Sequence, residues 1–199
     1  MEEKILARFE HMRKYFGVTK AVDDVTITVE RGEIRGLIGE NGAGKTTLLK
    51  ILCGVNRADD GTVDLLGGSP ADAATRAKIG VVFEDAFFYG TFTAAQVARS
   101  LAGMYGARWN ADSFSAYLRR FGLDAGKKLK EYSRGMRLKL SLAAALAHGP
   151  ELLVLDEATA GLDPVVRGDL LDLFLEFIQD ERHSIVMSSH ITADLEQIA

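Results

Sequence analysis

Residues 39–46 read GENGAGKT and fit the pattern G-x-x-x-x-G-K-[ST] at every defined position. The apolar segment GLIG (36–39) predicts a strand before this loop, and TTLLKILCGV (46–55) predicts a helix after it. A glycine loop between a strand and a helix can wrap its backbone N–H groups around phosphate oxygens. A lysine in this place reaches the β- and γ-phosphates, a threonine hydroxyl suits Mg²⁺, and the positive end of the helix faces the anion.

This loop predicts an α/β fold that binds a nucleoside triphosphate. We expect the nucleotide to contact a continuous run of loop and helix residues, with the lysine also serving catalysis and the first threonine holding metal. The run is Asn41, Gly42, Ala43, Gly44, Lys45 and Thr46. A glycine-rich turn that only caps a helix is the alternative, and the strand before the loop and the helix after it argue against it.

A second motif, LLVLDE (152–157), places two acids at the end of an apolar strand. In α/β sheets, ligands bind at the carboxyl ends of the strands. Asp156 could hold Mg²⁺ through water beside the phosphate loop, and Glu157 could polarise the water that attacks the γ-phosphate. Alone, this motif is a weak signal, since Asp156 could simply cap a helix. Together with the phosphate loop it predicts a hydrolytic site.

Hydrophobic periodicity predicts an α/β core that carries an inserted all-helical segment. From about residue 93 to 148 the apolar residues recur at helical spacing, as in Val97, Leu101 and Tyr105. A long amphipathic helix is expected over 165–180. Strands are expected at 22–30, 33–39, 61–67, 78–84, 152–156 and 184–190.

Composition narrows the function further. The net charge is −4 and the basic residues do not cluster, so nothing favours nucleic acid as a partner. Cys53 is the single cysteine, which predicts no disulfide and a reducing compartment. The N-terminal segment does not have the pattern of a signal peptide, and no apolar run approaches the length of a membrane span. If the protein works at a membrane, another subunit must supply the span.

Taken together, these motifs resemble the ATPase subunit of ATP-binding cassette (ABC) transporters over essentially the whole chain. The resemblance implies a P-loop NTPase (RecA-like) core with an N-terminal antiparallel β subdomain and an inserted α-helical subdomain. Residues 1–199 would form a single domain. Within this domain, the β subdomain and the P-loop core would comprise residues 1–92 and 149–199, and the helical signature subdomain would comprise residues 93–148. Family members usually continue for another strand or two, so we expect the chain to be truncated after ITADLEQIA.

The resemblance adds Thr47 to the nucleotide-binding residues of the phosphate loop and assigns roles to three further residues. His190, after MSS, matches the switch histidine that contacts the γ-phosphate. Asp163, in AGLD (160–163), matches the carboxylate of the family's D-loop. Phe16, in RKYFGVTKAV, stands where the family stacks an aromatic ring on adenine. Without the resemblance, His190 would be structural, Asp163 a helix cap before Pro164, and Phe16 a core residue.

The family signature, Leu-Ser-Gly-Gly-Gln, reads YSRGM here (132–136). Ser133 and Gly135 keep the hydroxyl and the close backbone approach that contact ATP, whereas Arg134 adds a charge and Met136 removes an amide. Glu84 replaces a glutamine that senses Mg²⁺, and we expect it to contact the metal. Signatures with a basic third residue resemble those of bacterial exporter-type (ABC-2-like) ATPases.

The resemblance implies a subunit that binds ATP and Mg²⁺ and dimerises around two ATP molecules, as a homodimer or with a related ATPase subunit. It would drive a membrane-spanning permease, an exporter rather than an importer, from the cytoplasmic face of the cell membrane. Two alternatives remain open: a soluble, non-transport ABC ATPase, and a slowly hydrolysing, ATP-gated binding module. The aromatic group Phe83, Phe87, Phe88, Tyr89 and Phe92 could pack in the core or dock a membrane partner.

Overall fold

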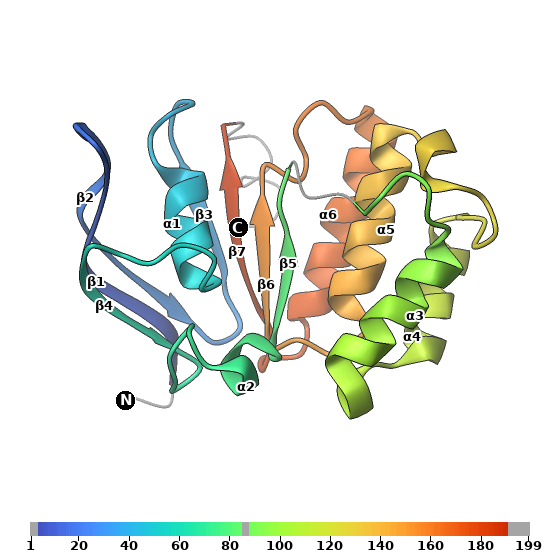
Figure 1. Cartoon of the computed structure of the whole chain (residues 1–199), viewed down its shortest axis with the longest axis horizontal. Coiled ribbons are helices and arrows are strands. Elements are labelled where there is room, and N and C mark those ends of the chain that lie inside the picture. Colours follow the sequence, from blue (N-terminus) through green and yellow to red (C-terminus); the bar gives the residue numbers. More distant parts are fainter. Residues whose placement is uncertain (1–3, 85–87, 191–199) are drawn as a thin grey trace.

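The computed structural model describes residues 4–84 and 88–190 (Figure 1). Two sheets and a group of helices account for most of these residues. The strands are β1 (Ile5–Phe16), β2 (Thr19–Glu30), β3 (Ile34–Ile38), β4 (Asp60–Leu65), β5 (Ile79–Val82), β6 (Leu152–Asp156) and β7 (Ser184–Ser189). The α-helices are α1 (Lys45–Leu52), α2 (Ala73–Arg76), α3 (Ala94–Tyr105), α4 (Ala111–Arg120), α5 (Arg134–Leu146) and α6 (Pro164–Ile178), with 3₁₀ turns at Gly106–Arg108 and Leu129–Glu131.

The central sheet is parallel and has the strand order β3-β7-β6-β5. Its strands are short and apolar, and every residue of β6 and β7 is buried. Strands covered on both faces read as continuous hydrophobic runs, which is how LLVLD appears in the sequence. All carboxyl ends of a parallel sheet lie at one edge, so residues that follow β3, β6 and β7 come together.

The second sheet is antiparallel, with the order β2-β1-β4. Its longest neighbour pair, β1 and β2, contains several register shifts, one of them between Phe9 and Met12. His11, within this shift, has a positive φ of 53°. Because an extra residue breaks the two-residue alternation of side chains, β1 does not show a strand pattern in the sequence. The sequence predicted β2 and β4 but not β1.

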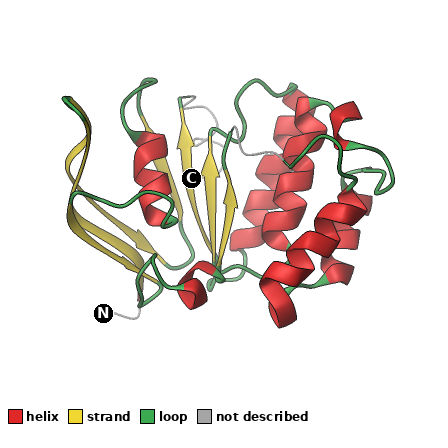
Figure 2. Ribbon diagram, in the orientation of Figure 1, coloured by secondary structure: helices red, strands yellow, loops and turns green. Residues whose placement is uncertain are grey.

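The elements form layers, which Figure 2 shows by secondary structure. The antiparallel sheet lies on one side, α1 lies between the two sheets, and α5 and α6 cover the other face of the parallel sheet. Helices α3 and α4 lie outside α5. The three long helices α3, α4 and α5 fall between β5 and β6 in the chain, which confirms the expected helical insertion into an α/β core.

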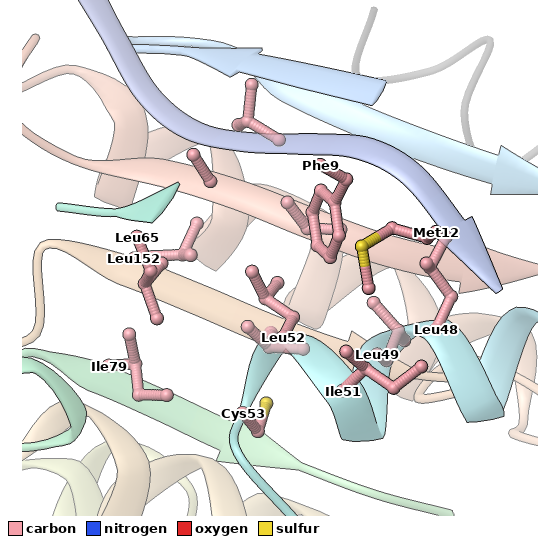
Figure 3. Packing of buried hydrophobic residues seen from close by; sticks show 14 of the residues in the cluster. Phe9, Met12, Leu48, Leu49, Ile51, Leu52, Cys53, Leu65, Ile79 and Leu152 are labelled. Atoms are coloured by element: carbon pink, nitrogen blue, oxygen red, sulfur yellow. The ribbon is translucent and has the colours of Figure 1, made fainter. Parts of the chain in front are cut away.

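Alternate residues of β6 belong to different cores. Leu152 and Val154 pack with α1 and the antiparallel sheet, in the cluster drawn in Figure 3. Leu153 and Leu155 pack with α5 and α6 on the opposite face. A third cluster fills the space among α3, α4 and α5. Fully burying one leucine side chain contributes roughly 1.5–3 kcal/mol, so β6 is held firmly from both sides.

The aromatic group near β5 is mostly packed. Phe83 lies against the α1 core, and Phe88 and Phe92 lie against the helical core. Tyr89 is 77% exposed, and Phe87 lies outside the described residues. Within residues 4–84 and 88–190, no helix combines the length and hydropathy that a membrane span requires.

Candidate functional site

The predicted phosphate loop lies at the edge of the sheet where the parallel strands end. Figure 1 shows the loop before α1, the carboxyl ends of β6 and β7, and the first turns of α5 and α6 at this same upper edge. The motifs at 39–46, 152–157 and 184–190 are far apart in the chain, and the parallel sheet is what brings their ends together.

The loop conformation depends on two of its glycines. Gly42 and Gly44 have φ values of 87° and 84°, in the left-handed region that L side chains rarely adopt. A Cβ on Gly44 would also lie 2.0 Å from the carbonyl oxygen of Ala21 in β2. Gly44 is the N-cap of α1, so the positive end of this helix opens into the loop. The geometry fits an anion above the N-terminus of α1.

Lys45 joins the loop to the acidic pair. Its Nζ donates to the carbonyl oxygens of Gly39 (2.6 Å) and Glu40 (3.0 Å) and lies 3.5 Å from Oε1 of Glu157. The two charged side chains are only 9% and 10% exposed. A buried charge is costly unless it is paired with an opposite charge, and Lys45 and Glu157 form such a pair.

Glu157 is held from its other oxygen by His190, whose Nδ1 lies 2.6 Å from Oε2. The backbone of Glu157 has a positive φ of 50°, which is unfavourable for a residue with a Cβ. Strained backbone of this kind occurs at functional sites when the surrounding structure fixes it. Oε1 is buried and, among the described residues, has only the ion pair with Lys45 and no hydrogen bond. Glu157 therefore presents a buried carboxylate oxygen beside a cation.

Asp156 lies next to Thr46 at the same edge. The Thr46 hydroxyl donates to Oδ1 of Asp156 at 3.0 Å, and the Ser188 hydroxyl donates to the same oxygen at 2.7 Å. Asp156 is 2% exposed. A hydroxyl and a carboxylate side by side are the oxygen donors that Mg²⁺ prefers, and Mg²⁺ commonly completes its shell with water and substrate phosphates. Thr46 and Asp156 thus fit Mg²⁺. The described residues contain no cluster of three acidic, histidine or cysteine ligands, so a fully protein-made metal cage is not present there.

A pocket of about 570 Å³ lies beside the loop. Gly42, Ala43, Gly44 and Lys45 line it on one side, and residues 20–23 of β2 line it on another. Phe16 ends β1, is paired with Thr19, and is 53% exposed. The Lys14 Nζ lies 5.4 Å from the centre of its ring. An exposed ring beside the strand that walls the pocket is free to stack on a flat ligand.

Ser133 and Asp163 both cap helices. The Ser133 hydroxyl accepts from the Met136 N–H at 3.2 Å at the start of α5, and Asp163 accepts from the Val165 N–H at 2.9 Å at the start of α6. The capping that we gave as the alternative for Asp163 is therefore present. Gly135 lies in the first turn of α5, where a Cβ would come within 3.8 Å of Val166. These starts of α5 and α6 lie at the same edge of the sheet as the phosphate loop.

Glu84 and Arg134, the two residues whose charges differ from the family pattern, contact each other in the structure. The Arg134 guanidinium donates to Oε1 of Glu84 at 2.9 Å, with side chains 53% and 43% exposed. Both residues line a small hollow together with Glu157 and Leu162. The extra negative charge of Glu84 is thus matched by the extra positive charge of Arg134. The metal contact expected for Glu84 stays a prediction.

Comparison with known proteins agrees with this geometry. The sequence profile of the family described as "ABC transporter" matches residues 22–160. The chain belongs to this family. It is 37% identical to an uncharacterized ABC transporter ATP-binding protein of Synechocystis sp., covering 90% of this chain and 52% of that protein. It is 34% identical to the bacitracin transport ATP-binding protein BcrA of Enterococcus faecalis, covering 96% of this chain and 63% of BcrA.

The chain therefore spans between half and two-thirds of the length of these two curated relatives. A solved structure described as an ATP binding subunit of an ABC transporter superposes with a TM-score of 0.83 at 28% identity, covering 98% of this chain and 83% of that one. The expected fold is confirmed: a P-loop NTPase core with an antiparallel β part and a helical insertion.

The structure brings Lys45, Thr46, Asp156, Glu157 and His190 into one connected group. Ser188 belongs to that group and was not among the predicted residues. Its signal was a small polar residue at the end of the strand segment SIVMSSH, two positions before the predicted His190.

Proposed function

We propose that this chain is the ATP-binding and ATP-hydrolysing part of an ABC transporter. The observation that carries the proposal is the connected group at the carboxyl edge of the sheet. There, a phosphate-loop lysine, a hydroxyl next to a buried aspartate, and a buried glutamate held by a histidine all converge.

ATP binding follows from the loop and the pocket. In this structure Lys45 Nζ contacts the carbonyl oxygens of Gly39 and Glu40 and the carboxylate of Glu157. When ATP binds, its phosphates replace these groups as partners of Lys45. The backbone N–H groups of residues 41–47 and the N-terminus of α1 add positive potential there. Phe16 stacks on the adenine at the side of the pocket walled by β2.

Asp156 and Glu157 have different roles in the proposed hydrolysis. Thr46 and Asp156 hold Mg²⁺, which when bound neutralises charge on the phosphate oxygens. Glu157 accepts the proton of the water that attacks the γ-phosphorus as the bond to the bridging oxygen of ADP breaks. His190 fixes the glutamate through Oε2, so Oε1 is the oxygen left to take this proton.

Two copies are needed for a complete site in this proposal. Ser133 and Gly135 lie at the start of α5, and we expect them to contact the nucleotide held by Lys45 of a second copy. Asp163 would lie along the same interface. This arrangement is supported by the resemblance and by the position of the first turn of α5 at the edge that carries the loop. The dimer is a homodimer or a pair with a related subunit.

Replacing the base tests the assignment. The Glu157→Gln variant keeps the side-chain size but cannot accept the proton. We expect wild-type affinity for ATP, phosphate release lower by roughly 10²–10⁴-fold, and a dimer that accumulates with ATP in size-exclusion chromatography. Full turnover by this variant would refute Glu157 as the base.

We further propose that the dimer drives a membrane-spanning permease from the cytoplasmic face of the membrane, in the direction of export. The similarity to a protein named for bacitracin transport supports the coupling to transport. The direction of export is supported by the resemblance of the signature at 132–136 to those of exporter-type members. Co-purification with a multi-span membrane protein that stimulates phosphate release tests it. Co-purification with ribosomes instead would favour a soluble, non-transport ATPase.

The Glu84–Arg134 ion pair favours a second candidate function, a slowly hydrolysing binding module gated by ATP. A signature turn tied to its own core by an ion pair is less free to close on a second copy. Phosphate release measured with and without the permease separates the two: a pump is stimulated by its permease, whereas a gated module stays slow in both conditions.

A further inference from the structure

The β7 residue Ser188 stands out because it touches both acids of the proposed site. Its hydroxyl donates to Oδ1 of Asp156 at 2.7 Å and accepts from the backbone N–H of Glu157 at 3.0 Å. The same N–H also lies 3.2 Å from the backbone carbonyl oxygen of Ser188. Ser188 is 0% exposed, so these contacts are made without competition from water.

The two contacts act on different features. The first fixes one oxygen of a carboxylate that is 2% exposed, and hydrogen bonds to a charged group are about twice as strong as neutral ones. The second holds the backbone at Glu157, the residue with a positive φ of 50°. A strained backbone keeps its conformation only where its surroundings over-determine it. Ser188 contributes to that constraint from the neighbouring strand.

Thr46 also donates to Oδ1 of Asp156, but its hydroxyl is the group expected to turn to the metal. Ser188 has no such second task. We therefore expect Ser188 to remain the donor to Asp156 when nucleotide binds. Groups that orient a metal-binding carboxylate through a hydrogen bond commonly change metal affinity when they are removed.

We propose that Ser188 is a positioning residue that orients Asp156 toward Mg²⁺ and holds the backbone of Glu157 in place. This inference rests on the proposed function, because it assigns Ser188 a part in the same nucleotide site. Ser188 touches neither nucleotide nor metal itself.

The same strand offers a matched control. Ser184 also lies in β7 and is 0% exposed. Its hydroxyl donates to the carbonyl oxygen of Glu30 and accepts from the N–H of Gly32, both at 3.0 Å. Ser184 is four residues from Ser188 and therefore on the same face of the strand, but at its other end. Ser184→Ala thus removes a buried hydroxyl that makes two hydrogen bonds, at the end of the strand that is far from the site.

The experiment compares Ser188→Ala with Ser184→Ala in the full protein. Binding of a fluorescent ATP analogue is titrated with and without Mg²⁺, and phosphate release is measured over a Mg²⁺ series. We expect both variants to lower the urea midpoint of unfolding and to bind the analogue without Mg²⁺ as the wild type does. Ser188→Ala alone should need roughly tenfold more Mg²⁺ for half-maximal binding enhancement, with a kcat lowered by a similar factor and KM little changed.

Two further results decide the proposal. Ser188→Thr, which keeps the hydroxyl, should restore the Mg²⁺ requirement, and Ser188→Cys, nearly the same size but a weak donor, should not. Equal Mg²⁺ requirements in Ser188→Ala and Ser184→Ala would overturn the role of Ser188 while leaving the proposed function intact. Failure of the wild-type protein to bind the analogue in any condition would overturn the proposed function, and this inference with it.

Discussion

Lys45→Met removes the cation that faces Glu157 while keeping a side chain of similar length. Both side chains of this pair are about nine-tenths buried, at 9% and 10% exposure. Breaking a buried ion pair from one side typically costs about 3–5 kcal/mol, because it leaves an uncompensated charge with little water. His190 still contacts Oε2 of Glu157, which places the expected loss near the lower limit, about 3 kcal/mol. For a chain of this size that corresponds to roughly 6–12 °C in Tm.

The assay is urea unfolding of the nucleotide-free protein at neutral pH. A second variant, Lys45→Met with Glu157→Gln, removes both charges, and we expect it to recover roughly 1–3 kcal/mol of the loss. Lys14→Met is the control, because the partner of Lys14, Asp59, is 40% exposed and its charge remains in contact with water when Lys14 is removed. It should lose clearly less stability. A Lys45→Met variant no less stable than Lys14→Met, or losses at 45 and 157 that simply add, would refute the inference that the pair is a buried, coupled interaction.

Three other predictions concern an ion pair and two buried side chains. The Arg134→Ala and Glu84→Gln changes should act through one interaction, so the double variant should release phosphate no more slowly than the slower single variant; additive losses would contradict a shared role. Burial raises the pKa of Cys53 to about 12, so alkylation of the native protein at pH 8 should be roughly a thousandfold slower than that of an ordinary thiol, and fast alkylation would mean that this thiol is accessible. Burial lowers the pKa of His148 below its ordinary value of 6.5, so the unfolded chain takes up that proton first. Stability should therefore fall as the pH drops below about 6.5, with a shallower slope in His148→Gln, and parallel slopes would show that another group is responsible.

The meeting of the phosphate loop and the acidic pair could be predicted from the sequence because both motifs are local. The phosphate loop has its glycines and its lysine within eight consecutive residues. In LLVLDE, the two acids directly follow the apolar residues that form the strand. Their meeting at one edge of a parallel sheet is a general property of α/β folds. The continuous apolar run of β6 also indicated a strand buried on both faces.

What the sequence could not supply were contacts between segments. Ser188 reaches Asp156 only because β6 and β7 pair with residue 156 opposite residue 188, and a register is set by the whole sheet. The Glu84–Arg134 pair joins the loop after β5 to the start of α5, and each residue alone looked like an isolated departure from the family pattern. Strand β1 was missed because its irregular register hides the alternation of buried residues.

We propose that two copies close around two ATP molecules, with Lys45 and Ser133 of different copies at each one. Mixing Lys45→Met protein with Ser133→Ala protein tests this arrangement. Each mixed dimer would contain one site with both changes and one site with neither. We predict that each variant alone releases little phosphate, and that the equal mixture regains roughly a quarter of the wild-type rate from random pairing in two-fold dimers. A mixture no more active than its separate components would refute the shared site, as would a Ser133→Ala protein that hydrolyses ATP normally.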